Sequence, residues 1–497
     1  MTAKVFSCSF SGLDSQIIEV EADISHGMPA FNIVGLGDTS VQESKERIRS
    51  SIKNSGMQFM PIRKTINLAP AQLRKHGTLF DLPIAISLLI ASGQVRFNDV
   101  DCSILVGELA LNGEVKPVRG AILFAEAAEK AGFKQIFLPV DNAQEASLFS
   151  EIKVFPVSSL KALLDHINGR KLIEPTKKVG INLRQRPITF SQVIGLEKGK
   201  RALEIALAGS HHALLYGSPG CGKTVLCRSF RSLLPTLTKT EMLQTTKVFS
   251  IAGLLGGLNQ FIKSRPFREV HHGTSFSTLI GGGVPPRPGE ISLAHNGILF
   301  LDEIAEFNHK TLEGLRQPLE DREVKISRNQ TTTTFPCDFT LLATMNPCPC
   351  GNLADSKIRC ICTPHQIAQY QKKLSGPLID RFDLFVHITR SPIQKLTKPD
   401  HAATQRIFEN IERARTIQLQ RGKLNHQLDI EDLKMYCEIS LESQKLLFQA
   451  VEKFNLSNRA YLKILKIART IADIDAMEKI QTHHIMEAIQ FRRPKLT

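Results

Sequence analysis

The architecture of this chain follows from one stretch, Gly217-Ser218-Pro219-Gly220-Cys221-Gly222-Lys223-Thr224. It matches the pattern G-x-x-x-x-G-K-[ST], in which glycines let backbone N–H groups close around phosphates, so we expect all eight residues to bind nucleotide. The apolar run 213–216 before it predicts a buried parallel strand, and residues 225–230 predict the start of a helix. This context predicts a nucleoside triphosphate site, where Lys223 reaches the β- and γ-phosphates and Thr224 binds Mg²⁺.

A second apolar strand, residues 297–303, ends in the two acids Asp302 and Glu303. This is the Walker B arrangement, in which the aspartate holds the Mg²⁺ hydration shell and the glutamate polarises the attacking water. Together the two motifs predict hydrolysis of ATP, with ATP and Mg²⁺ as cofactors.

Length and composition limit the class of protein. A chain of 497 residues predicts about three domains. No apolar run reaches the length of a membrane span, and the first residues lack the pattern of a signal peptide, so we expect a cytoplasmic protein with no membrane partner. In that compartment the ten cysteines are reduced, and a cluster of them is better explained by metal binding than by disulfides.

The chain is strongly basic, with a net charge of +15. This charge favours a polyanionic partner, most often nucleic acid, although a generally basic proteome is an alternative explanation. The sequence has no Trp and only four Tyr, so we expect contacts to the phosphate backbone and not base stacking.

Residues 1–170 alternate between strand-like and helix-like segments, which predicts an α/β or α+β domain. The expected strands are residues 15–22, 102–109 and 135–139, and the expected helices are 40–55, 82–91 and 121–131. Within this region, the stretch 107–120 (GELALNGEVKPVRG) resembles the strand, turn and helix of Lon-type protease domains.

Lon-type domains cut peptides with a Ser-Lys pair, and this chain lacks it. The segment that should carry the serine, residues 75–83, has none, and the lysine position falls near Ile122. Covalent acyl transfer needs a nucleophile with its base, so we expect a domain without peptidase activity. Thr78 as a nucleophile is the remaining alternative.

The polar and basic stretch 171–188 predicts a linker. We expect an ATPase core over residues 189–392 and a helical lid over 393–497. Residues 189–196 resemble the segment that opens AAA+ ATPases, and residues 197–208 predict a helix that leads to the glycine loop.

The long, glycine- and proline-rich stretch between the two nucleotide motifs predicts a functional loop. It resembles the helix-2 insert of magnesium-chelatase-like AAA+ proteins, and such inserts point into a central pore. His271 and His272 within it are candidate metal ligands, nucleotide-state sensors or ordinary loop residues.

A helix over residues 312–319 should lead into a β-hairpin, residues 324–326 and 331–335. The hairpin resembles the pre-sensor hairpin of the same AAA+ proteins, and Lys325 and Arg328 near its tip are candidate DNA phosphate contacts. An ordinary solvated hairpin is the alternative.

Three further residues resemble AAA+ site residues. Asn346, at the end of the expected strand 340–347, has the position of sensor 1, which orients the attacking water. Arg381 resembles an arginine finger acting on a neighbour's ATP, with a structural ion pair as the alternative. Arg459 begins a helix that resembles sensor 2 and would contact the γ-phosphate. The lid helices are expected at residues 401–421, 430–435, 441–454 and 459–473; the basic side of the last is either a solvated face or a contact surface.

Four cysteines lie between sensor 1 and the finger, Cys348, Cys350, Cys360 and Cys362. Two C-x-C pairs on one loop predict a structural tetrahedral Zn²⁺ site, because four thiolates close the coordination sphere. Reduced cysteines without metal are the alternative.

The order of these parts resembles the YifB/ComM family, most specifically in residues 281–290 (GGGVPPRPGE) and 375–383 (SGPLIDRFD). The resemblance implies an α/β fold: a P-loop AAA+ core, an N-terminal Lon-protease-like domain and a C-terminal lid. It also implies a homo-hexameric, ATP-driven helicase that promotes branch migration of single-stranded and branched DNA during integration of imported DNA. A protein-remodelling ATPase and a chelatase-type subunit for Mg²⁺ insertion are the alternatives.

Overall fold

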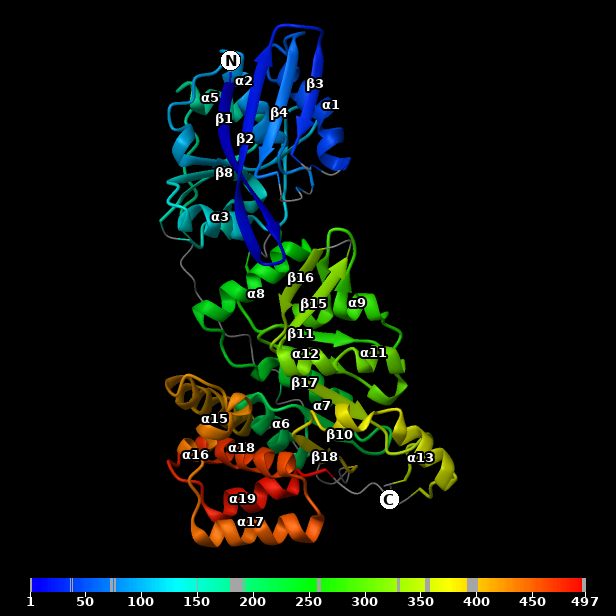
Figure 1. The fold of residues 1–497 in the computed structure, drawn as a ribbon. Helices are drawn as coiled ribbons and strands as arrows, with labels where there is room; N and C mark the ends of the chain where they lie inside the picture. The colour runs from blue at the N-terminus through cyan, green and yellow to red at the C-terminus, as the bar shows by residue number, and fades with distance from the viewer. Residues whose placement is uncertain are drawn as a thin grey trace.

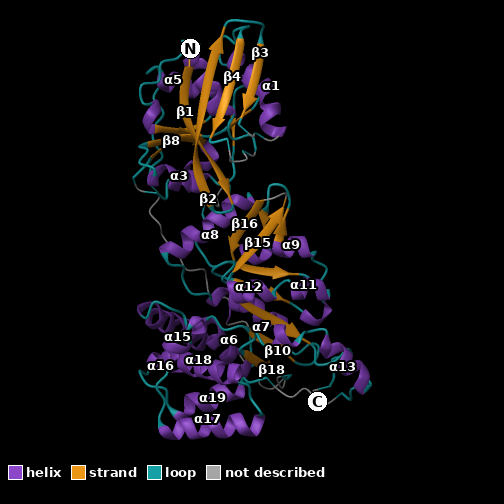
Figure 2. Ribbon diagram, viewed as in Figure 1, coloured by secondary structure: helices purple, strands orange, loops and turns teal. Residues whose placement is uncertain are grey.

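The structure is a computed structural model and describes residues 2–35, 37, 39–71, 75, 77–149, 151–178, 190, 193–256, 261–328, 331–353, 358–390 and 401–493. Figure 1 shows three parts along the long axis, coloured blue to cyan, green to yellow, and orange to red. The strands gather in the first two parts, and the third is helical (Figure 2). Across these ranges, no helix is long and apolar enough to span a membrane.

The N-terminal part is built on a seven-stranded mixed sheet. Its strands are β1 (Thr2–Ser11), β2 (Asp14–Ser25), β3 (Ala30–Val34), β4 (Arg63–Ala69), β5 (Ser103–Leu105), β8 (Gln135–Pro139) and β9 (Lys153–Val157), in the order β3-β4-β2-β1-β5-β8-β9. The long hairpin β1–β2 is antiparallel, and β5, β8 and β9 continue from β1 in parallel. Ile18, Val20 and Ala22 alternate along β2 and are fully buried, which explains why the sequence pattern predicts this strand.

Five helices accompany this sheet: α1 (Thr39–Asn54), α2 (Asp81–Ala91), α3 (Ala121–Lys130), α4 (Ala143–Ala146) and α5 (Leu160–Ile167). The helices expected at residues 40–55, 82–91 and 121–131 are therefore confirmed. The single strand expected at 102–109 is wrong, because the chain leaves β5 and begins a separate ribbon, β6 (Glu108–Leu109) with β7 (Val115–Lys116). Gly107 marks the break, where a side chain has no room: an added Cβ would lie 2.6 Å from Val115 Cγ1.

The middle part contains a five-stranded, fully parallel sheet. Its strands are β10 (Ala213–Tyr216), β11 (Phe267–Val270), β14 (Ile298–Leu301), β17 (Thr340–Met345) and β18 (Leu384–His387), in the order β11-β14-β17-β10-β18. Every residue of β14 and β17 is buried. Continuous apolar runs of this kind are typical of parallel strands covered on both faces. The fold is mixed α/β.

Helices and two ribbons surround this sheet. The helices are α6 (Glu197–Gly209), α7 (Lys223–Ser229), α8 (Lys239–Ala252), α9 (Phe276–Ile280), α10 (Glu290–Leu293), α11 (His309–Glu313), α12 (Arg316–Asp321), α13 (Pro364–Lys372) and α14 (Gly376–Ile379). The ribbons are β12 (Gly281–Gly282) with β13 (Arg287–Pro288), and β15 (Glu323–Arg328) with β16 (Thr331–Pro336).

The single helix expected over residues 312–319 is wrong, because two short helices, α11 and α12, cover this region. The chain breaks between them at Gly314, which lies against the ring of Phe276. Pro318 in α12 has no N–H to donate to a preceding turn.

The C-terminal part consists of α15 (His401–Gln420), α16 (Ile430–Tyr436), α17 (Leu441–Phe454), α18 (Asn458–Ile474) and α19 (Thr482–Gln490). The first four match the expected helices, whereas α19 was not expected. Apolar residues of α15, α18 and α19 share one hydrophobic cluster with α6 and with strands β10 and β18. These helices are thus packed against the sheet of the middle part.

The N-terminal and middle parts meet through α3 and α8. Ile122 and Leu123 of α3 are fully buried and belong to the same hydrophobic cluster as Ile251 of α8. Lys247 of α8 forms an ion pair with Glu126 of α3 at 2.6 Å. Of the expected linker 171–188, only residues up to 178 are described, and residues 391–400, around the expected start of the lid, lie outside the described ranges.

Candidate functional site

The glycine loop joins β10 to α7. The strand ends at Tyr216, and the helix begins at Lys223. Gly220 and Gly222 have φ angles of +72° and +91°, which residues with a Cβ rarely adopt. The loop therefore curls back over the N-terminus of α7, where backbone N–H groups and the helix dipole favour an anion.

Lys223 occupies the space inside this loop. It is 7% exposed, and its Nζ donates to the carbonyl oxygens of Gly217 at 2.7 Å and Ser218 at 3.0 Å. A third bond runs to Oδ1 of Asn346 at 3.1 Å, at the end of β17. Burial lowers the pKa of Lys223 below its usual range. This ammonium group is held by neutral acceptors that phosphate oxygens can replace.

Thr224 faces the two acids at the end of β14. Its Oγ1 donates to Oδ1 of Asp302 at 2.9 Å, and the hydroxyl of Thr344 in β17 donates to the same oxygen at 2.6 Å. The same Thr344 oxygen accepts the backbone N–H of Glu303 at 2.9 Å. Glu303 itself has a left-handed backbone, with a φ of +52°.

The structure therefore brings together five of the residues predicted from the sequence, Lys223, Thr224, Asp302, Glu303 and Asn346. They meet because β10, β14 and β17 are neighbouring parallel strands, whose carboxyl ends lie at one edge of the sheet. Sequence reasoning missed Thr344, the fully buried hydroxyl that joins both acids. The available signal was a polar residue within an otherwise apolar strand, two positions before Asn346.

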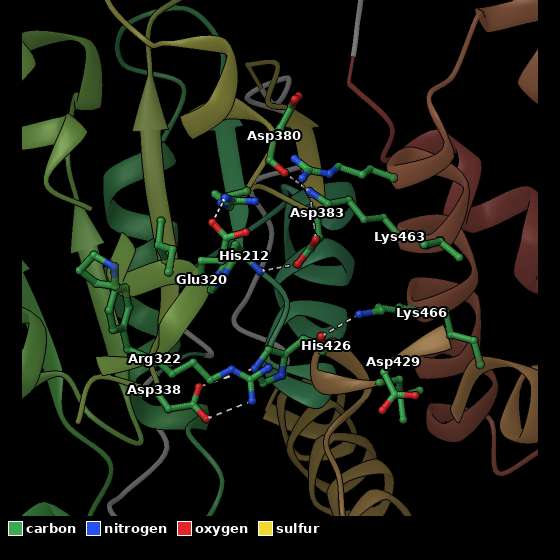
Figure 3. A pocket seen from close by; sticks show the side chains of 18 of the residues that line it. His212, Glu320, Arg322, Asp338, Asp380, Asp383, His426, Asp429, Lys463 and Lys466 are labelled. Carbon is green, nitrogen blue, oxygen red and sulfur yellow. Dashed lines mark hydrogen bonds and ion pairs between the residues drawn. The ribbon is translucent and has the colours of Figure 1, made fainter. Parts of the chain in front are cut away.

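Arg381 and Arg459 lie elsewhere. Both line a cavity of about 410 Å³ between the sheet and the C-terminal helices, shown in Figure 3. Arg459 also lines a second cavity of about 800 Å³, whose lining includes Tyr216 and Met345, the last residues of β10 and β17. His212, Phe339 and Asp383 also line the first cavity, and each directly precedes a strand of the sheet. The first cavity is therefore at the amino edge, opposite the glycine loop, and none of residues 217–224 lines it. Four-residue β10 separates the two edges by about 13 Å.

The cavity at the amino edge contains several ion pairs (Figure 3). Arg381 Nη2 contacts a carboxylate oxygen of Glu320, so the structural ion pair that was the alternative for Arg381 is present. Lys463 of α18 lies 3.4 Å from Asp383. Burial alone would raise the pKa of Asp383, but Lys463 and His211 lower it well below its usual range. Arg459 is exposed and has no ion pair with another described residue.

The basic side of α18 is engaged inside the protein. Lys463 Nζ donates to the carbonyl oxygens of Asp380 at 2.6 Å and Phe382 at 2.7 Å. Lys466 Nζ donates to the carbonyl oxygen of His426 at 3.0 Å, and Arg469 is 1% exposed and paired with Asp473 at 3.0 Å. This side is neither a solvated face nor an open contact surface.

The hairpin β15–β16 buries one face and exposes the other. Val324, Ile326 and Phe335 are buried in the core of the middle part. Lys325 is exposed and forms an ion pair with Glu323 at 2.8 Å. Arg328 is in β15 beside the tip, and its side chain lies outside the described residues.

The candidate ligand His271 lies next to His272, with ring centroids 4.1 Å apart. Over the described ranges, neither belongs to a group of three or more residues able to hold a metal ion.

Comparisons with known proteins cover most of the chain. Residues 189–396 match the family described as magnesium chelatase, subunit ChlI; residues 20–142 match subunit ChlI of Mg-chelatase, and residues 401–492 match its C-terminal region. The YifB protein of Escherichia coli is 41% identical over 485 residues, which are 97% of this chain and 95% of YifB. The competence protein ComM of Haemophilus influenzae is 38% identical over 498 residues, 99% of this chain and 97% of ComM. The chain belongs to the YifB/ComM family of magnesium-chelatase-like proteins.

One part of this YifB/ComM-family chain also resembles Lon proteases: Lon protease 2 of Bacillus subtilis is 28% identical over 180 residues, 33% of this chain and 32% of that protein. Ile122, near the expected lysine position, is fully buried at the junction with α8. The hydroxyl of Thr78 donates to the carboxylate of Glu108.

The four cysteines of this YifB/ComM-family chain converge. The sulfur atoms of Cys348, Cys350 and Cys360 are 3.4–3.6 Å apart, and Cys362 Sγ accepts the Cys350 N–H at 3.4 Å. All four sulfurs lie within 4.8 Å of one another. A tetrahedral Zn²⁺ with Zn–S bonds of about 2.3 Å requires S···S separations of about 3.8 Å. The donor set therefore fits zinc.

This cysteine loop also touches the glycine loop. A Cβ added to Gly351 would lie 2.4 Å from the ring of Pro219, so the two loops are in direct contact. Backbone N–H groups of Asn352 and Ile361 lower the pKa of the Cys350 thiol to about 6.

Proposed function

We propose that this protein is an ATP hydrolase that works as a homo-hexameric ring and moves DNA. The observation that carries the proposal is the division of the predicted site between two edges of one sheet. Lys223, Asp302 and Asn346 follow strands at the carboxyl edge, whereas Arg381 lines the cavity at the amino edge. Arg381 would therefore act on the nucleotide of a neighbouring copy.

At the carboxyl edge, the P-loop of an AAA+ core would bind ATP with Mg²⁺. Lys223 exchanges its carbonyl partners for the β- and γ-phosphate oxygens. Thr224 and Asp302, which are hydrogen-bonded to each other, would supply the oxygens that hold Mg²⁺ and its hydration shell. Glu303 polarises the attacking water, and Asn346 orients it. The bound Mg²⁺ neutralises charge on the phosphates.

Arg381 of a neighbouring copy would stabilise the charge that develops on the γ-phosphate. A contact that joins opposite edges of identical subunits is heterologous, and such contacts form a ring where the rotation between copies closes. Arg459, as part of the lid, would contact the γ-phosphate.

DNA is the polymer that a positively charged ring suits best, and the similar ComM protein is named for competence. We infer that the ring promotes branch migration of DNA junctions during integration of imported DNA. Lys325 and Arg328 on β15 would contact DNA phosphates.

The chain divides into a Lon-like domain without peptidase activity (1–170), a linker (171–188), the ATPase core (189–392) and the lid (393–497). A structural Zn²⁺ held by the four cysteines would brace the glycine loop.

ATP turnover with and without branched DNA tests the proposal, with movement of a three- or four-way junction as the second readout. We expect stimulation by DNA and junction movement, both lost in Glu303→Gln. Turnover that is indifferent to DNA would refute the DNA motor. Unfolding of a tagged protein, or insertion of Mg²⁺ into a porphyrin with partner subunits, would then identify the alternative functions.

Mixed rings test the sharing of the site. Glu303→Gln and Arg381→Ala should each abolish turnover alone. In an equal mixture, an intact Glu303 meets an intact Arg381 at about a quarter of the interfaces if copies mix randomly. Recovery of about a quarter of wild-type turnover supports action in trans, and no recovery contradicts it.

A further inference from the structure

The arginine predicted to serve a neighbouring copy is engaged within its own chain. Arg381 Nη2 contacts the carboxylate of Glu320, and the two side chains are 19% and 58% exposed. The ion pair lies in the cavity at the amino edge of the sheet (Figure 3). In this arrangement Arg381 faces a carboxylate of its own subunit and is not free to meet a phosphate.

Two other basic side chains of the cavity, Arg322 and Lys463, have separate acidic partners. Arg322 lies 3.9 Å from Asp338, and Lys463 lies 3.4 Å from Asp383. Glu320 is therefore the carboxylate that holds Arg381. Arg381 Nε is buried and has no hydrogen-bond partner within the described ranges, so this guanidinium still has a donor for another acceptor.

Glu320 is also close in sequence to the hairpin. It lies in α12, and β15 begins three residues later at Glu323. Arg322 lies between the end of α12 and the start of β15. It has a left-handed φ of +57° and ends the helix. A displacement of the Glu320 carboxylate therefore acts on the short helix that leads directly into β15.

We propose that Glu320 is a positioning residue that holds Arg381 away from the neighbour's nucleotide until the ring is engaged. This inference rests on the proposed function. When Arg381 turns to a phosphate of the neighbouring copy, the ion pair breaks, and α12 and the hairpin are released. When DNA moves the hairpin, Glu320 withdraws from Arg381 and turnover begins. The same ion pair thus couples DNA contact to hydrolysis in both directions.

Glu320→Gln tests this role, because it removes the charge and keeps the shape. Ion pairs of this exposure shift an equilibrium by about two- to fivefold, so turnover without DNA should rise by about that factor. The DNA-stimulated rate should change little, because the ion pair is already open there. The stimulation ratio therefore falls by about two- to fivefold. Asp321→Asn is the matched control: it removes a charge one residue away, where the side chain contacts Gln317.

The double variant Glu320→Gln/Arg381→Ala checks that the gain in turnover without DNA depends on Arg381. It should be as inactive as Arg381→Ala alone, and DNA-independent turnover in the double variant would contradict the inference. A Glu320→Gln protein with an unchanged stimulation ratio, or with the same ratio as Asp321→Asn, would overturn the inference while wild-type stimulation by DNA upholds the proposed function. A wild-type ring that does not respond to DNA would refute both.

Discussion

Replacing Thr344 with valine removes one hydroxyl from the candidate site and leaves its shape nearly unchanged. That hydroxyl is fully buried, donates to Asp302 Oδ1 at 2.6 Å and accepts the N–H of Glu303 at 2.9 Å. In Thr344→Val, Asp302 loses one of its two hydroxyl donors, and the Glu303 N–H loses its acceptor. Both acids become less firmly placed, although neither has been changed.

The size of the effect follows from the two bonds. A hydrogen bond to a charged group is worth about 1.5–3 kcal/mol, and a buried donor left without a partner costs about 1–3 kcal/mol. The two together amount to about 2.5–6 kcal/mol. If half of this is expressed in the transition state, kcat falls by about 8- to 160-fold. KM for ATP should change by less than about twofold, because Lys223 and the loop N–H groups still bind the phosphates.

Steady-state ATP turnover measures this split between kcat and KM, and thermal unfolding reports the folded state. Thr340→Val is the matched control, since Thr340 begins the same strand at the opposite edge and is 5% exposed. A kcat of Thr344→Val within twofold of the wild type would refute the argument. Equal losses of activity in both variants would assign the effect to packing of β17.

Three further outcomes are expected. Elemental analysis should find one zinc per chain, lost in Cys348→Ser together with Cys360→Ser; protein that retains full zinc content would contradict the site. Ile122→Lys should lower the free energy of unfolding by about 3 kcal/mol, because it places an unpaired charge in the buried junction of α3 with α8; thermal or denaturant unfolding measures this, and an unchanged midpoint would place Ile122 outside the core. Burial lowers the pKa of His212 from 6.5 to about 4, so the unfolded chain takes up this proton first as the pH falls. The stabilisation of the fold by neutral, buried His212 is full above pH 6.5 and is lost as the pH falls towards 4. His212→Gln should therefore flatten the profile of thermal stability against pH between these two values.

The carboxyl edge of the sheet was predictable because its chemistry depends on local patterns. β14 and β17 are short apolar runs followed at once by Asp302 and Asn346, and β10 is followed by the glycine loop that ends at Lys223. Parallel strands place such residues at one edge, and the three strands are neighbours, so Lys223, Asp302 and Asn346 meet. Thr344 was not predicted as a site residue, because its contacts with Asp302 and Glu303 depend on the register between β14 and β17, and a residue pattern does not specify that register.

The amino edge was predicted less well. Arg381 and Glu320 are 61 positions apart, and no local pattern pairs them. The basic residues of α18 repeat with helical spacing. The same spacing occurs in a helix whose basic face is exposed and in one whose basic face binds backbone carbonyls. In the structure, the lysines of α18 donate to the carbonyl oxygens of Asp380, Phe382 and His426, and such backbone acceptors cannot be recognised from residue types.

These carbonyl contacts fix the two arginines relative to each other. Lys463 donates to the residues on both sides of Arg381, Asp380 and Phe382, and so ties that segment to α18. Arg459 lies four residues before Lys463 and hence on the same face of this helix. The segment that contains Arg381 and the helix that contains Arg459 are therefore joined as one unit, whereas the side chain of Arg381 contacts Glu320 of α12. In the proposed ring, the backbone of Arg381 would already be in place for a neighbouring nucleotide, and the ordering that remains would be a rotation of the Arg381 side chain.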